Sequence, residues 1–457
     1  MEELEAEVRR LRGRSNHDGG ISHVEFSSVD AATSADESCP VNPRRHRQRT
    51  DMISQLSSDE VTRYSRQLLL ADGFGVAGQK RLLSSSVLVV GAGGIGSTVL
   101  PYLAAAGVGK ITVVDFDGVD RSNLHRQIIH DDASVGRNKA ESACGSLRAL
   151  NPTITCVAVS EALTADNALR LVAAHDAIVD ASDNPKTRYL INDACVFEGK
   201  VLISGSAMGT EGQLTVYGCG VDGRPCYRCL YPNTNSTEGC KSCSDNGVLG
   251  TVPGTIGMLQ ATETIKVLTG IGVPMYDRLL MYDAMQCSFL SIKKPLSSRV
   301  CAVCGPGSEI SSMADSSAST VAVRGPSDEN GLVSTNARLP PELQLSCQEY
   351  DQLRKDGSPH VLLDVRVRRQ YEMCSLDGAI NIPLGELHDN LDRIEDLSAG
   401  SKPVYCLCRR GIASAEATLV LAKVLSKGDR PDIHSVRNIT GGLNGWCNAV
   451  DPSFPKY

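Results

Sequence analysis

The sequence lacks several features that mark particular classes of protein. None of its apolar runs approaches the roughly 20 residues that a membrane-spanning helix needs. Its first residues, MEELEAEVRRLRGR, are charged and contain no apolar stretch of the kind found in a secretion signal. We therefore expect a cytosolic protein that does not enter a membrane. An excess of positive charge is also missing, since 46 Lys and Arg stand against 53 Asp and Glu and give a net charge of −7. The broad basic surface of a nucleic-acid-binding protein is thus not predicted, and we expect proteins or nucleotides as partners.

Cysteine, in contrast, is abundant, with 17 residues in a chain of 457. In a reducing cytosol such cysteines are free thiols, metal ligands or catalytic groups rather than a disulfide framework. Three pairs have the C-x-x-C spacing of zinc-binding turns, namely Cys226/Cys229, Cys240/Cys243 and Cys301/Cys304. One zinc ion needs four thiolates, so two pairs suffice. The short gap between the first two pairs favours joining them, whereas the glycine after CAVC favours the third pair as partner of the first.

Composition divides the chain into four parts. Residues 1–52 begin with a short amphipathic pattern and become rich in Ser, Asp and Gly, which predicts a disordered arm. The basic run RRHRQR in this arm is either a nuclear address or a solvated cluster of charge. Residues 305–340 have the composition of a linker. Residues 53–304 are then a large domain, and residues 341–457 form a tail domain.

A βαβ unit is predicted from SSVLVVGAGGIGSTVLPYLAAAGVGKITVVDFD. Gly91, Gly93 and Gly96 fit the G-x-G-x-x-G pattern that holds phosphates between a strand and a helix. Asp115 closes the second strand, where an acidic group can bind ribose hydroxyls. This pattern serves NAD as well as ATP, so it predicts a nucleotide without deciding which one.

The residues after the second predicted strand favour ATP over a dinucleotide. The stretches DFDGVDRSNLHRQ and GRNKAESA carry several phosphate-seeking side chains, among them Arg126 and Lys139. A further strand, in HDAIVDASDN, leads to Asp183 and Asn184. A carboxylate at the carboxyl end of a parallel strand is well placed to bind Mg²⁺.

In the tail domain, the stretch YCLCRRGIASA predicts that Cys408 lies at a turn from a strand to a helix. The N–H groups and the helix dipole at such a turn stabilise an anion, which suits a thiolate or a persulfide. A cysteine phosphatase needs an arginine six positions after its nucleophile to clamp the phosphate, and here that position holds Ser414. The loop therefore favours sulfur transfer over phosphatase chemistry. A buried free cysteine is the remaining alternative.

Taken together, these motifs resemble a known family. RYSRQ, GAGGIG, DFDGVDRSNLHRQ, ASDN and CYRC are similar to the adenylating domains of the ubiquitin-activating, ThiF and MoeB type. DGAINIP and NITGGLNGW are similar to stretches of the rhodanese fold. The combination resembles the eukaryotic molybdopterin synthase sulfurylases, which also activate a ubiquitin-related modifier. The resemblance implies an α/β protein, with a Rossmann-like E1/MoeB-type adenylating domain followed by a C-terminal rhodanese-like α/β domain.

The resemblance also implies cofactors and site residues. ATP with Mg²⁺ is expected to bind at Gly94, Asp115, Ser122, Asn123, Leu124, His125, Arg126, Lys139, Asp183 and Asn184, with Asp183 also on magnesium. Zn²⁺ is expected at Cys226, Cys229, Cys301 and Cys304. The implied catalytic residues are Cys243, Cys408 and Arg66, of which Arg66 reaches the neighbouring subunit's site in a homodimer. The competing interpretations are a spare thiol for Cys243 and a surface ion pair for Arg66.

The implied activity joins both domains. The large domain adenylates the C-terminal glycine of a ubiquitin-like sulfur-carrier protein, and a cysteine desulfurase loads Cys408 as a persulfide. The persulfide attacks the acyl-adenylate, and Cys243 resolves the product to a thiocarboxylate for molybdenum cofactor biosynthesis and tRNA wobble-uridine 2-thiolation. An NAD-dependent dehydrogenase and a non-catalytic scaffold are the rival interpretations. The scaffold interpretation stays open because Ile412 and Ala413 replace the asparagine and aspartate of the family loop, and Asp377 replaces a proline.

Overall fold

The computed structural model describes residues 55–70, 73–219, 223–232, 247–320, 339–398, 402–426 and 435–456. Their strands form one sheet of eight strands in the large domain and one of five strands in the tail domain. The predicted disordered arm and Cys243 lie outside the described residues. Among the helices that are described, none is both long and apolar enough to cross a membrane.

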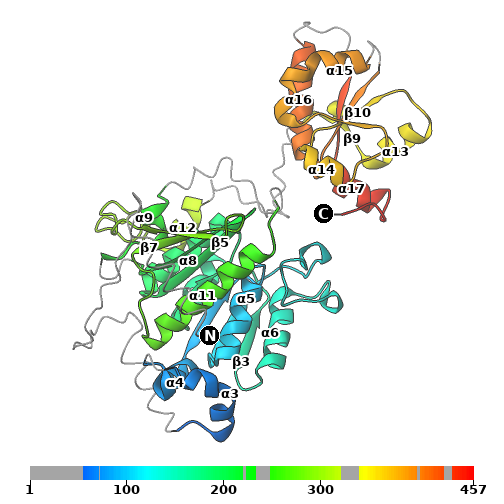
Figure 1. Cartoon of the computed structure of the whole chain (residues 1–457). Helices are drawn as coiled ribbons and strands as arrows, with labels where there is room; N and C mark the ends of the chain where they lie inside the picture. The colour runs from blue at the N-terminus through cyan, green and yellow to red at the C-terminus, as the bar shows by residue number, and fades with distance from the viewer. Residues whose placement is uncertain are drawn as a thin grey trace, which may run out of the picture. The chain divides into compact units, whose positions relative to one another are not determined.

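The large domain alternates strands with helices along most of its length (Figure 1). Its elements are α3 (Ser58–Leu68), α4 (Gly75–Ser84), β1 (Ser86–Val90), α5 (Gly96–Ala106), β2 (Lys110–Val114), α6 (Lys139–Leu150), β3 (Thr155–Val159), α7 (Ala165–Ala173), β4 (Ala177–Asp180), α8 (Pro185–Glu198), β5 (Val201–Met208), β6 (Glu211–Tyr217), α9 (Tyr227–Leu230), α11 (Thr251–Thr269), β7 (Arg278–Asp283), β8 (Ser288–Lys293) and α12 (Met313–Thr320). Two 3-10 turns, Arg121–Asn123 and Asp132–Ser134, lie between β2 and α6.

The large sheet has the strand order β3-β2-β1-β4-β5-β6-β7-β8, in which β3 to β5 run parallel and β6 to β8 are antiparallel additions. Every residue of β1, SVLVV, is buried, as expected for a central strand that has helices on both faces. The strand order reverses between β1 and β4. Such a switch point opens a crevice at the carboxyl ends of the strands, where ligands bind in open α/β sheets.

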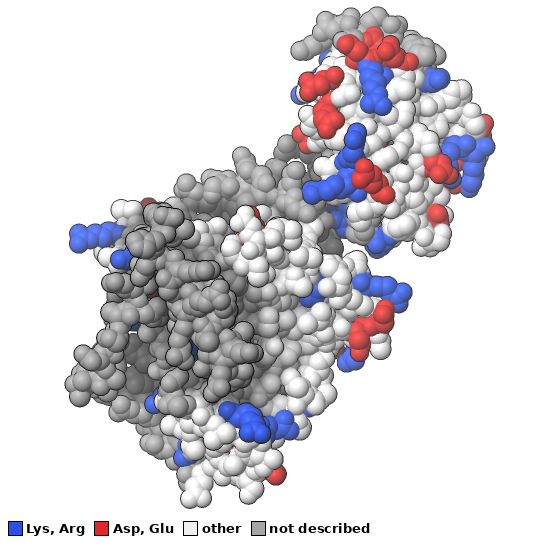
Figure 2. Space-filling view, viewed as in Figure 1, with Lys and Arg blue, Asp and Glu red and all other residues white. Residues whose placement is uncertain are grey.

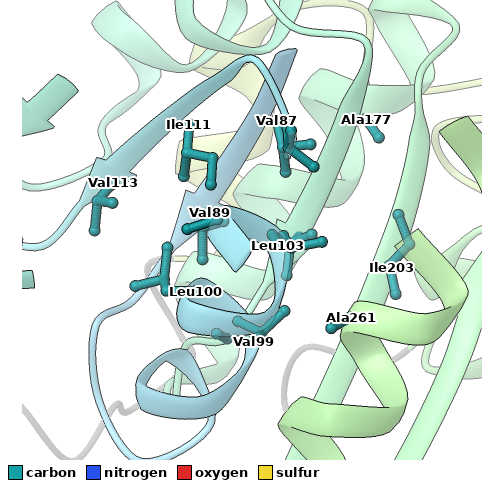
Figure 3. Close-up of a cluster of buried hydrophobic side chains, with 14 of the residues drawn as sticks. Val87, Val89, Val99, Leu100, Leu103, Ile111, Val113, Ala177, Ile203 and Ala261 are labelled. Atoms are coloured by element: carbon teal, nitrogen blue, oxygen red, sulfur yellow. The ribbon is translucent and has the colours of Figure 1, made fainter. Parts of the chain in front are cut away.

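Alternate residues of β1 supply two separate cores, because successive side chains of a strand point to opposite faces. Val87 and Val89 pack with α5 and α11, and Figure 3 shows them together with Leu103 and Ala261. Leu88 lies in the second core, with residues of α7 and α8. Both faces of the sheet are therefore covered, and its functional edge is the one formed by the strand ends.

The predicted linker, residues 305–340, contains a helix. α12 packs against α7 and α8, and Met313 is buried in the same core as Leu88. Ser316 is also buried, and its hydroxyl donates to the Asp193 carboxylate at 2.6 Å. The serine-rich composition that predicted a linker thus includes serines that are hydrogen-bonded inside the domain.

The tail domain contains β9 (Gln344–Leu345), α13 (Cys347–Lys355), β10 (Val361–Asp364), α14 (Arg368–Met373), β11 (Ala379–Asn381), α15 (Leu391–Ser398), β12 (Val404–Leu407), α16 (Ile412–Ser426), β13 (Val436–Ile439) and α17 (Gly442–Ala449). Three 3-10 turns, Pro341–Leu343, Leu384–Glu386 and His388–Asn390, connect these elements. All five strands run parallel in the order β11-β10-β12-β13-β9, which matches the small α/β domain predicted from the sequence. The central strand β12 ends immediately before Cys408.

One face of the described surface carries charged side chains of both signs. On the face drawn in Figure 2, Lys and Arg side chains lie among Asp and Glu side chains, with no large patch of one sign among the coloured residues. This distribution agrees with the modest net charge of −7.

Candidate functional site

The turn between β1 and α5 is built on glycines that no other residue can replace without movement. Gly91 has φ 103°, and a Cβ there would lie 2.6 Å from the Ala181 carbonyl oxygen at the end of β4. A Cβ on Gly96 would lie 2.3 Å from the Gly91 carbonyl oxygen. The missing side chains allow the turn, the helix and the neighbouring strand end to approach closely, as a phosphate-binding turn requires.

A cavity of about 770 Å³ opens beside this turn, within the range of small-molecule sites. The sequence-predicted residues that line it are Gly91, Gly93, Gly94, Asp115, Arg126, Lys139, Asp183 and Asn184. Among the residues predicted for nucleotide binding, Gly96, Ser122, Asn123, Leu124 and His125 do not line it, and neither does the predicted catalytic residue Arg66. The structure therefore gathers most of the expected nucleotide site around one cavity.

Asp115 and Lys139 face each other across the end of β2. The two carboxylate oxygens of Asp115 accept from the backbone N–H groups of Ala92 at 2.8 Å and Asp117 at 3.0 Å. Burial raises the pKa of Asp115, although the nearby Lys139 acts in the opposite direction. Lys139 is itself buried, and its Nζ lies 2.9 Å from the Asp117 carboxylate. The Lys139 ammonium group is thus held by the Asp117 carboxylate in the cavity lining.

Residues 122–125, just before Arg126, do not line the cavity themselves, but they hold this arginine in place. Arg126 Nη2 donates to the Asn123 side-chain oxygen at 2.6 Å, and His125 Nδ1 lies 2.9 Å from the Ser122 carbonyl oxygen. Asn123 therefore orients a guanidinium that lines the cavity, although Asn123 does not line it.

The loop after β4 is positioned by the start of α8. The Asn184 side chain accepts from the Thr187 N–H at 3.0 Å and caps the helix, whose first residue is Pro185. Arg188, one turn further on, donates to the carbonyl oxygens of Ser182 at 2.9 Å and Gly205 at 3.0 Å. No sequence pattern predicted a role for Arg188, because a single arginine in a helix carries no signal that separates it from a surface residue.

Tyrosines also line the cavity, and no motif of the sequence predicted them. Tyr217, Tyr227 and Tyr231 line it, and the Tyr227 ring makes an edge contact with Tyr189 at a centroid distance of 5.0 Å. Burial raises the pKa of both Tyr217 and Tyr227, so these hydroxyls stay neutral at physiological pH. The cavity lining therefore combines charged groups with aromatic rings.

Four thiols meet at a second place in the large domain. The Sγ atoms of Cys226, Cys229, Cys301 and Cys304 lie within 4.8 Å of one another. Individual contacts join the two pairs, with 3.6 Å from Cys226 to Cys301 and 3.4 Å from Cys229 to Cys304. A Cβ on Gly305 would lie 2.7 Å from the Cys301 carbonyl oxygen, so the glycine after CAVC permits the tight turn. Four cysteines at this spacing suit a metal such as zinc.

A buried ion pair supports this cysteine cluster. Arg228, between the first two cysteines, donates through Nε and Nη2 to both carboxylate oxygens of Asp193 on α8, at 2.7 to 3.0 Å. The side chains are 3% and 0% exposed. Ser316 of α12 donates to the same carboxylate. The ion pair therefore joins the cysteine turn, α8 and α12.

Cys408 lies at the turn between β12 and α16, as predicted. Its thiol is buried and accepts from the Gly411 N–H at 3.1 Å and from the Ser414 hydroxyl at 3.2 Å. Gly411 has φ 86°, a left-handed conformation that favours glycine. Two donors on one sulfur are suited to a thiolate or a persulfide. The sequence showed only that Ser414 stands where a cysteine phosphatase has its arginine. Its contact with the Cys408 thiol depends on the folded turn.

Cys406 differs from its neighbour although both belong to the same core. It is fully buried, and burial raises its pKa to about 12. At neutral pH it therefore stays a thiol and acts as an apolar core residue. The loop also carries Ile412, which is 42% exposed at the start of α16.

Comparisons with known proteins agree with this geometry. The model of the ThiF family matches residues 64–303, and the model of the rhodanese-like domain matches residues 346–449. The adenylyltransferase and sulfurtransferase MOCS3-1 of Zea mays is 45% identical over 410 residues, which cover 88% of this chain and 84% of that protein. The adenylyltransferase and sulfurtransferase MOCS3 of Aedes aegypti is 42% identical over 416 residues, with 91% and 92% covered.

The chain belongs to the MOCS3 family of adenylyltransferases and sulfurtransferases. It is an enzyme with a ThiF-type adenylating domain, which binds ATP, and a rhodanese domain, as the sequence predicted. Both rival interpretations, an NAD-dependent dehydrogenase and a non-catalytic scaffold, disagree with membership of this family of adenylyltransferases and sulfurtransferases. Among solved structures, Escherichia coli MccB with ATP is 24% identical, with a TM-score of 0.47 over 53% of this chain and 74% of that one.

Proposed function

We propose that the chain activates the C-terminal carboxylate of a ubiquitin-like sulfur-carrier protein in the cavity beside the glycine turn, and converts it to a thiocarboxylate with sulfur carried on Cys408. The observation that carries the proposal is the pair of hydrogen bonds that Gly411 and Ser414 donate to the Cys408 thiol. The thiocarboxylate would serve molybdenum cofactor biosynthesis and tRNA thiolation, in the cytosol, where thiols stay reduced.

In the first step the carboxylate of the carrier attacks the α-phosphorus of ATP, an acyl-phosphate bond forms and pyrophosphate leaves. Negative charge grows on the phosphate oxygens, and Arg126 and Lys139 can stabilise it from the cavity wall. Asp183 is the residue proposed to hold Mg²⁺, which would neutralise further phosphate charge. We assign the tyrosines of the cavity lining to the residues that precede the carrier's C-terminal carboxylate, since their rings offer apolar surface.

In the second step the terminal sulfur of the Cys408 persulfide attacks the acyl carbon, and AMP leaves. The resulting acyl disulfide is cleaved when the Cys243 thiolate attacks Cys408 Sγ, which releases the thiocarboxylate and leaves a Cys243–Cys408 disulfide. A dithiol reductant then restores both thiols, and a cysteine desulfurase supplies the next sulfur atom. These roles of Cys243 and the desulfurase come from the family resemblance.

The remaining site residues form part of the proposal. Zn²⁺ bound by the four clustered thiols would join the end of the large domain to its middle. Arg66 lies exposed on α3, outside the cavity lining, which is compatible with action on a neighbouring subunit in a homodimer. The proposed parts of the chain are the arm 1–52, the large domain 53–304, the linker 305–340 and the tail domain 341–457. Within the linker, α12 packs on the large domain.

Two assays on the full chain test the proposal. ATP–pyrophosphate exchange should require a ubiquitin-like protein that ends in glycine, and mass spectrometry after treatment with a desulfurase and cysteine should find the added sulfur on Cys408. Cys408→Ala should keep the exchange and lose thiocarboxylate formation, because adenylation does not use the persulfide. Added sulfur on Cys406 with none on Cys408 would refute the proposal.

A further inference from the structure

The start of α17 holds the sulfur-carrying loop from behind. The backbone N–H of Leu443 donates to the Cys408 carbonyl oxygen at 2.9 Å, and the N–H of Asn444 donates to the Arg409 carbonyl oxygen at 2.9 Å. Both donors lie in the first turn of the helix, where N–H groups have no partner within the helix itself. The two carbonyl groups of the loop are therefore directed toward α17.

This contact determines where the next two N–H groups of the loop point. In a planar trans peptide the C=O and the N–H of one unit point in opposite directions. Since the carbonyl oxygens of Cys408 and Arg409 point toward α17, the N–H groups of Arg409 and Arg410 point away from it. The following N–H, that of Gly411, already bonds to Cys408 Sγ at 3.1 Å.

Glycines make the close approach possible. Gly442 has φ 58°, and a Cβ there would lie 2.3 Å from the Cys408 carbonyl oxygen. On the other side, a Cβ on Gly411 would lie 2.7 Å from the Gly441 nitrogen. Any side chain at either position would push the loop and the helix start apart.

A buried cysteine outside the proposed reaction supports the same segment. The Cys347 thiol, at the start of α13, donates to the carbonyl oxygens of Thr440 at 3.3 Å and Gly442 at 3.6 Å. Burial raises the pKa of Cys347 to about 11, so the thiol keeps its proton and remains a donor at neutral pH.

We propose that residues 440–444 are a positioning element for sulfur transfer, which sets the carbonyls of Cys408 and Arg409 and so aims the N–H groups of the loop at an anion on Cys408. The Cys347 thiol supports this element through its contacts with the carbonyl groups of Thr440 and Gly442. The inference rests on the proposed role of Cys408. It concerns how tightly the anionic sulfur is held, so it should appear in the pH dependence of the thiol as well as in the rate.

The test compares two glycines of the tail domain in the full chain. Gly442→Ala introduces a positive-φ alanine that also collides with the Cys408 carbonyl, whereas Gly357→Ala introduces one at φ 69° with no atom within 4 Å of its Cβ. We expect Gly442→Ala to lower thiosulfate-to-cyanide sulfur transfer about tenfold or more, as loss of an aligned donor does. The rate–pH profile of Cys408 alkylation should move to higher pH. ATP–pyrophosphate exchange should stay unchanged, and Gly357→Ala should match the parent in all three assays.

Equal sulfur-transfer rates and equal alkylation profiles in the two glycine variants would overturn the inference. If Gly442→Ala does not fold, the substitution of Cys347 decides. Cys347→Ala should move the alkylation profile in the same direction, and Cys347→Ser, which keeps a donor, should restore it; identical profiles for both would refute the inference. A Cys408→Ala protein that still transfers sulfur would instead refute the proposed function.

Discussion

The two proposed reaction sites of this chain lie at equivalent places, the carboxyl ends of parallel strands, and both suit an anion, yet they present different groups to it. The cavity of the large domain presents cationic side chains, Arg126 and Lys139, beside its glycine turn. The tail domain surrounds the Cys408 thiol with a backbone N–H and the neutral hydroxyl of Ser414. A triphosphate spreads several charges over many oxygens and suits discrete cations, whereas one sulfur anion can be held by a few aligned dipoles.

The domains also differ in what holds their turns in place. In the large domain a four-cysteine cluster and the Arg228–Asp193 ion pair join segments that are far apart in sequence. In the tail domain the described contacts between the sulfur loop and α17 are backbone hydrogen bonds at closely packed glycines, and the Cys347 side chain supports the same segment from α13. The cysteine cluster of the large domain thus depends on contacts between side chains, whereas the contact of the sulfur loop with α17 depends on backbone conformation.

The largest expected effect tests the cysteine cluster. Cys301→Ser should lose its zinc and unfold the large domain at a lower temperature, because a structural zinc contributes on the order of 10 kcal/mol. The tail domain should keep its sulfur-transfer activity. Bound zinc is measured by elemental analysis and unfolding by calorimetry. Cys287→Ser, at an exposed cysteine, and Cys243→Ser should retain the metal; zinc loss from either would contradict the ligand set.

The next largest effect concerns the buried ion pair. Arg228→Ala leaves the Asp193 carboxylate buried without its charge partner, which costs about 3–5 kcal/mol. Chemical denaturation should show this loss in the transition of the large domain, with the tail transition unchanged. Arg170→Ala, at an exposed position on α7, is the control and should change the free energy of unfolding by less than about 0.5 kcal/mol. If Arg228→Ala lowered the free energy of unfolding only slightly, the Arg228–Asp193 ion pair would not be what stabilises this part of the large domain.

Lys139→Ala tests the use of cationic side chains directly. It should lower ATP–pyrophosphate exchange by about 10²–10³-fold, as loss of one aligned stabilising group does, and leave thiosulfate sulfur transfer intact. Arg170→Ala again serves as the control for removal of a positive charge. An equal loss of both activities would mean that Lys139 acts through stability rather than through the phosphate charge.

The smallest expected effect is that of Ser414→Ala. Removal of one hydrogen bond to the Cys408 sulfur should slow sulfur transfer about 5- to 10-fold, since such a bond contributes about 1–1.5 kcal/mol. The adenylation rate should not change. Ser453→Ala, the same substitution at an exposed position of this domain, should leave both rates alone. A rate equal to that of the parent would leave the backbone N–H groups as the sole holders of the sulfur.

Much of both sites was predictable because it depends on short stretches of chain. Each site contains a turn between a strand and a helix, and the patterns GAGGIG and CRRG predicted the turns that hold Gly91 and Cys408, as VVDFD predicted Asp115 at the end of a strand. Composition did not reveal that residues 313–320 of the predicted linker form α12, because serine content does not distinguish a solvated serine from Ser316, which is buried and donates to Asp193. The contacts of Arg188 also escaped prediction, since they join it to the end of β4, to the loop after it and to β5.

By itself the sequence determined the local elements and the chemistry that each can carry, because periodicity, glycine placement and C-x-x-C spacing act over a few residues. The choice among three cysteine pairs was left open by the residues alone, and the tertiary structure joins Cys226 to Cys301, 75 residues apart. It likewise brings the start of α17 against the sulfur loop. Such contacts depend on strand order and on which faces pack together, and these follow from the burial of whole elements rather than from any local pattern.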